Sequence, residues 1–113
     1  MAMSRLTAVS VVCLLGFAAM LAAQPAMTNE DLIKLSKVGL SEDFVLNMIQ
    51  TQPTRFYTDT GRLVELKNNG ISERLILAAV KKNPPQEPLT TYGLIQLARA
   101  KFSDGFLVDL LNA

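Results

Sequence analysis

The sequence predicts an all-α fold of three 31-residue helix–turn–helix repeats, whose six short helices stack into one small globule or short solenoid. The chain aligns with itself at a shift of 31 residues without a gap, and Leu32, Leu63 and Leu94 coincide. Residues that cap helices recur at the same spacing, and prolines follow the first two units. Self-similarity with this period is typical of stacked helical repeats. The repeats cover approximately residues 28–53, 59–84 and 90–113.

Residues 1–23 are interpreted as a secretory signal peptide and are set apart from the fold. This segment begins with one basic residue and no acidic residue, continues as an apolar run, and closes on small residues. We expect cleavage between Ala23 and Gln24, which leaves residues 24–113 as a single domain. The alternative is an uncleaved membrane anchor, because the apolar run is close to the lower limit of about 18 residues for a spanning helix.

The composition of residues 24–113 favours a bacterial periplasm or the cell exterior. The chain of 113 residues has a single cysteine, Cys13, which lies in the predicted signal peptide, and it has no histidine or tryptophan. Small secreted eukaryotic domains usually depend on disulfides because their cores are thin. Since one basic residue belongs to the signal peptide, ten basic and ten acidic residues remain, and the net charge of the domain is zero.

Each repeat carries start and stop signals for two helices. Gly39 and Gly70 stand where a first helix ends in a left-handed residue, which glycine adopts at little cost. Pro53 and Pro84 end the second helices after about ten residues, because the residue before proline avoids helical geometry. Side-chain oxygens at the expected N-caps can accept the free N–H groups of the first turn. These N-caps are Thr28, Asp59 and Thr90 for the first helices and Ser41, Ser72 and Ser103 for the second helices.

Apolar residues fall on one stripe of each helix, which is typical of helices that pack against one another. Helices this short are marginal alone, so the three hairpins must share one core. The remaining faces carry scattered polar residues, and we expect no apolar patch on them. In the first repeat the expected stripe comprises Leu32, Leu35, Val38, Phe44 or Val45, Met48 and Ile49.

The third repeat departs from the pattern. Lys101 replaces the glycine, which costs about 1 kcal/mol if the left-handed turn is kept. Phe102 is expected in the core. Leu110 and Leu111 lie close to the last residue, Ala113, and must still find cover.

The first repeat also resembles a known module. Its segment Thr-Asn-Glu-Asp-Leu-Ile-Lys-Leu-Ser-Lys-Val-Gly-Leu-Ser-Glu-Asp (28–43) and the related segment 59–74 are similar to a helical-hairpin module of exported, mostly uncharacterised bacterial proteins. The resemblance covers the first two repeats well and the third loosely. Because the shared residues are caps and core positions, the resemblance implies a structure and no particular activity.

The residue types that carry out chemistry are scarce in the domain. Without histidine or cysteine there is little material for nucleophilic or acid–base catalysis, and the recurring serines are explained as caps. The acidic pairs Glu30-Asp31 and Glu42-Asp43 complement helix dipoles and lack the spacing of a calcium loop. A basic stripe with interleaved aromatics is absent. We therefore expect no enzyme activity, no cofactor, no metal and no nucleic acid.

One segment has the residue types of a binding site. Arg55, Phe56 and Tyr57 lie between the first two repeats, and arginine and aromatic residues dominate interface energetics. The alternative is that Phe56 or Tyr57 folds back and seals the junction between these repeats. The resulting hypothesis is a non-enzymatic exported protein-interaction module with a protein or peptide partner. A self-assembling structural or envelope component, with membrane contact only if the signal segment is retained, is the first alternative, and an enzyme without a recognisable signature is the second.

Overall fold

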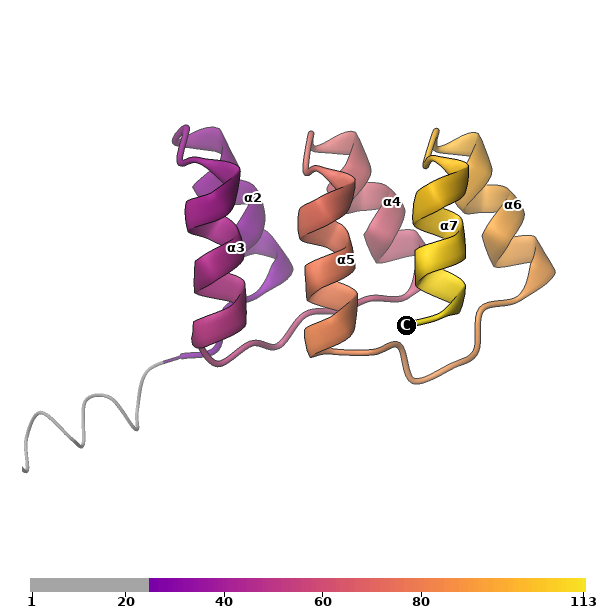
Figure 1. The fold of residues 1–113 in the computed structure, drawn as a ribbon, viewed down its shortest axis with the longest axis horizontal. Helices are drawn as coiled ribbons and strands as arrows, with labels where there is room; N and C mark the ends of the chain where they lie inside the picture. Colours follow the sequence, from indigo (N-terminus) through magenta and orange to yellow (C-terminus); the bar gives the residue numbers. More distant parts are fainter. Residues whose placement is uncertain (1–24) are drawn as a thin grey trace, which may run out of the picture.

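The computed structural model describes residues 25–113, so the predicted signal peptide lies outside the described residues. Three helical hairpins lie side by side in chain order (Figure 1). The all-α prediction is confirmed. No helix within residues 25–113 has the length and apolar character that crossing a membrane requires. Hairpin 1 consists of α2 (Asn29–Lys37) and α3 (Glu42–Thr51), hairpin 2 of α4 (Thr60–Asn68) and α5 (Glu73–Lys82), and hairpin 3 of α6 (Thr91–Arg99) and α7 (Asp104–Leu111).

Each described helix begins directly after the predicted capping residue. In all six, the side-chain oxygen of the N-cap accepts a hydrogen bond from the backbone N–H three residues later. At α2 the bond is reciprocal, because the backbone N–H of Thr28 also donates to Asp31 Oδ2 at 3.0 Å. Local side-chain chemistry therefore fixes where the helices start.

The turn inside each hairpin contains a residue in the left-handed region. Gly39 and Gly70 have φ values of +83° and +81°. Lys101 keeps the same conformation, with φ 70°, although it has a side chain. In hairpins 2 and 3 a backbone hydrogen bond between residues five positions apart closes the turn. Ile71 N donates to Leu66 O at 3.1 Å, and Phe102 N donates to Leu97 O at 3.3 Å. These bonds take up carbonyls that the ends of α4 and α6 leave free.

The turns lead to a stability prediction. Gly39→Val and Gly70→Val are each expected to lower the free energy of unfolding by at least about 1–2 kcal/mol, because valine enters the left-handed region only under strain. A Cβ atom at either position meets nothing within 4 Å, so the loss reflects the backbone alone. Lys101→Gly is expected to gain at most about 1 kcal/mol, since glycine also loosens the unfolded chain. Chemical denaturation measures all three, and an unchanged midpoint for Gly70→Val would contradict this account of the turn.

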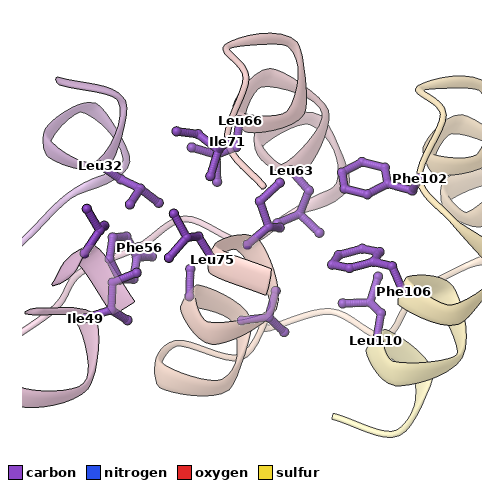
Figure 2. Close-up of a cluster of buried hydrophobic side chains, with 14 of the residues drawn as sticks. Leu32, Ile49, Phe56, Leu63, Leu66, Ile71, Leu75, Phe102, Phe106 and Leu110 are labelled. Atoms are coloured by element: carbon purple, nitrogen blue, oxygen red, sulfur yellow. The ribbon is translucent and has the colours of Figure 1, made fainter. Parts of the chain in front are cut away.

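The helices form two layers around one core. Helices α3, α5 and α7 lie in one layer and α2, α4 and α6 in the other (Figure 1), and α5 contacts both α3 and α7. Buried side chains from all three hairpins join into a continuous cluster (Figure 2). Within it, the Phe102 and Phe106 rings stack with their centroids 4.6 Å apart, as expected for a core Phe102. The largest fully buried side chains are Leu32, Val45, Ile49, Leu63, Leu66, Ile71, Ile76, Val80 and Leu97.

Some residues of the predicted stripe lie outside this core. Val38 is exposed, contrary to expectation, because it is the C-cap of α2 and follows the last helical turn. Of the two alternatives in α3, Val45 is buried and Phe44 is exposed. At the end of α7, Leu110 finds cover and Leu111 does not. The stripe was therefore located correctly, and its edges were not.

Candidate functional site

The first connector, residues 52–58, starts as a short extended pairing with the segment before α2. Met27 and Thr54 form an isolated parallel β-bridge. The backbone N–H of Met27 donates to Pro53 O at 2.9 Å, and the backbone N–H of Arg55 donates to Met27 O at 2.8 Å. The connector is thus held against hairpin 1 by backbone bonds.

Two asparagines hold the rest of the first connector. The side-chain amide of Asn29 donates to Tyr57 O and accepts from Tyr57 N, both at 2.8 Å. Asn83, the C-cap of α5, accepts from Phe56 N through Oδ1 at 3.0 Å. Its backbone carbonyl accepts from the Thr58 hydroxyl at 2.6 Å. We call Asn29 and Asn83 the asparagine clamp, because together they fix the connector to hairpins 1 and 2.

The clamped backbone sends neighbouring side chains in opposite directions. Phe56 is buried and lies with Ile49 and Leu75 in the core (Figure 2). Arg55 and Tyr57 are exposed, and 58% of the Tyr57 surface is accessible. Phe56 therefore takes the sealing role between the first two repeats. Of the three residues singled out in the sequence, only Arg55 and Tyr57 present a surface to a partner.

An open groove runs beside these two side chains. It has a volume of about 1280 Å³ and is lined by residues 55–60, residues 82–90 and the end of α7, including Leu110 and Leu111. The second connector, residues 83–89, supplies one wall and contains three prolines. Proline fixes φ and has no N–H, so this wall is stiff and poor in hydrogen-bond donors.

The groove offers contact surface rather than reactive groups. Its charges are mixed, with Arg55 and Lys82 opposed by Asp59 and Glu87. Among residues 25–113 no cluster of acidic residues could hold a metal ion. Over the same range every buried side-chain nitrogen or oxygen has a hydrogen-bond partner. The arrangement is therefore suited to binding by shape, aromatic contact and surface charge.

The asparagine clamp was not predicted from the sequence. Its bonds join residues 25 to 28 positions apart, which a local pattern does not reveal. The sequence holds one hint of it: hairpin 1 has Asn29 at a position where the other two hairpins have threonine, Thr60 and Thr91. In comparisons with known proteins, no family model, curated protein or solved structure matches the chain.

Proposed function

We propose that residues 24–113 form a non-enzymatic protein-interaction module, exported to a bacterial periplasm or secreted, which binds a peptide segment in the groove. One observation carries the proposal: the asparagine clamp fixes the backbone that presents Arg55 and Tyr57 at the groove edge. A clamped segment loses little conformational entropy when a partner binds. Arginine and tyrosine are also the residue types that contribute most per residue to interfaces.

The ring of Tyr57 is supported as a binding element. The guanidinium of Arg62 lies over it, 5.7 Å from the centroid, which favours a fixed ring position. Arg62 also pairs with Glu65 at 3.4 Å, so it is oriented from both sides. An apolar side chain of a partner can pack on the ring.

The chemistry of the groove also indicates the partner. Arg55 makes no ion pair within the described part of the chain, and its guanidinium can accept a carboxylate in a bidentate contact. The exposed Leu111 adds an apolar contact inside the groove. A peptide segment with an acidic side chain near an apolar or aromatic one fits this arrangement.

The test replaces the two presented side chains together. Arg55→Ala with Tyr57→Ala is expected to weaken partner binding by about tenfold or more, with little change in the unfolding midpoint. The matched control is Arg99→Ala with Tyr92→Ala, which removes another exposed arginine and tyrosine, both on α6 and neither in the groove lining. Capture from envelope extract identifies the partner by mass spectrometry, and titration of the purified partner measures affinity. Binding retained by the first pair, or lost equally by the control, would contradict a site in the groove.

A further inference from the structure

The two junctions between hairpins share one polar contact. At the first junction, the hydroxyl of the capping Ser72 donates to Glu42 Oε1 at 2.7 Å. At the second, the backbone N–H of the capping Ser103 donates to Glu73 Oε2, also at 2.7 Å. Glu42 and Glu73 are the first residues of α3 and α5. Hairpins 1 and 2 therefore each present an acid to the next hairpin, and hairpins 2 and 3 each receive one at a capping serine.

Each hairpin thus has a forward face, which packs on the next hairpin, and a rear face, which packs on the preceding one. The rear faces of hairpins 2 and 3 are apolar and covered: Ile71, Leu75, Phe102 and Phe106 are at most 5% exposed. In hairpin 1 the residues 31 positions before Ile71 and Leu75 are Leu40 and Phe44. They are equally apolar, yet 39% and 53% of their surfaces are exposed. The rear face of hairpin 1 is therefore an uncovered counterpart of the covered rear faces.

The forward face of hairpin 3 is uncovered in the same way. Ile49 and Val80 are at most 1% exposed in hairpins 1 and 2, whereas their counterpart Leu111 is 59% exposed. Asp104 stands in hairpin 3 where Glu42 and Glu73 stand in the others. Hairpin 3 therefore carries both an apolar residue, Leu111, and an acidic residue, Asp104, at the positions of a forward face.

A second forward position supports this comparison. Leu46 lies one turn from Glu42 and one turn from Gln50, and both of these residues bond to hairpin 2. Leu46 and its counterpart Leu77 are half-buried against the core. Their counterpart in α7 is Val108, which is 55% exposed. Val108 therefore lies on the uncovered forward face and is not part of the groove lining.

We propose that the forward face of hairpin 3 in one copy packs on the rear face of hairpin 1 in a second copy, head to tail, and repeats the internal junction. The end units of stacked helical arrays normally carry polar outer faces, whereas both outer faces of the part described, residues 25–113, expose apolar side chains. The two ends are also the complementary halves of a junction that the chain already forms twice. Asp104 of one copy would meet the capping Ser41 of the next, in the place of Glu73 and Ser103.

The rear face has room for such a contact. A shallow hollow of about 300 Å³ on hairpin 1 is lined in part by Leu35 and Met48. The counterparts of Met48 in the other hairpins, Ala79 and Leu110, are buried. Because the two contacting faces differ, the association does not stop at a dimer unless it closes into a ring. Leu111 lines the groove as well as this face, whereas Leu40, Phe44 and Val108 belong to the head-to-tail contact alone.

The test uses one substitution at each end. The protein is expressed from its full sequence and purified as the cell processes it, with its intact mass recorded. Sedimentation velocity of the wild type from micromolar to millimolar concentration is expected to show a mass that grows through dimer to larger species. Phe44→Glu and Val108→Glu each place a charge on one face and should weaken self-association by about tenfold or more. Asn69→Glu, at an exposed residue of the middle hairpin and therefore on neither end face, should leave association unchanged.

Mixing the two end variants gives the decisive result. At a concentration where the wild type associates and a tenfold weaker contact does not, each variant alone should stay monomeric, whereas the equimolar mixture pairs the two intact faces and should form a dimer and nothing larger. A wild type that stays monomeric, a single variant that associates as strongly as the wild type, or a mixture without dimer would overturn the head-to-tail contact. Unchanged circular dichroism of both variants verifies the fold. The variant with Arg55→Ala and Tyr57→Ala should assemble normally, so failure of the groove and failure of the head-to-tail contact are distinguishable.

Discussion

Phe56→Ala is expected to lower the free energy of unfolding by about 3–5 kcal/mol, the range for truncating a buried phenylalanine. Phe56 is 5% exposed and belongs to the core although it lies in a connector. Its removal leaves a cavity between hairpins 1 and 2, which the clamped backbone cannot close by relaxing. Urea unfolding measures the loss.

The control for this prediction is the adjacent residue. Tyr57→Ala removes a ring of similar size from the same connector, but that ring is exposed, so the loss should stay within about 0.5 kcal/mol. Equal losses for the two variants would show that the connector does not separate a packing residue from a presented one. A small loss of unfolding free energy in Phe56→Ala would contradict the sealing role of Phe56.

Asn29→Ala is expected to cost about 2–4 kcal/mol. The substitution removes two hydrogen bonds of 2.8 Å and leaves both backbone polar groups of Tyr57 without their partner. Asn29 is 9% exposed and both bonds are partly buried, so the loss of each costs about 1–2 kcal/mol. Asn29→Asp should fall between alanine and wild type, because aspartate still accepts from Tyr57 N and no longer donates to Tyr57 O. Chemical denaturation gives the order of the three proteins.

A second asparagine serves as the control. Asn69 donates to Glu65 O, one turn back in α4, and its side chain is exposed. Asn69→Ala should therefore change stability by no more than about 0.5 kcal/mol. If Asn29→Ala had an equally small effect, the clamp would contribute little and the connector would owe its position to Phe56.

Local rules predicted most of the fold. The N-caps and the glycine turns depend on residues within three or four positions of one another, so the sequence contains the whole interaction. Helical periodicity also locates an apolar stripe, but it does not say how wide the buried part is. Phe44 illustrates this limit: its counterparts Leu75 and Phe106 are buried by a preceding hairpin, and within residues 25–113 no hairpin precedes hairpin 1. The expectation that no apolar patch lies outside the core failed there and at Val108.

The candidate site was predicted less completely. The sequence points to the first connector because an arginine and two aromatics are unusual in a polar loop, and its role as a binding site stays a prediction. Which aromatic would be buried depends on the clamp, whose asparagines come from α2 and from the end of α5. Contacts over such sequence distances follow from the packing of the hairpins. They were therefore not available to reasoning from spacing alone.

The asparagine clamp has a consequence for how the array comes apart. Asn29, the first connector and Asn83 form one bonded path between hairpins 1 and 2, so neither hairpin can detach without breaking it. In the second connector Pro88 stands at the position of Tyr57, and it has no N–H for a bond like that from Tyr57 to Asn29. We therefore expect hairpins 1 and 2 to unfold as one cooperative unit and hairpin 3 to open first.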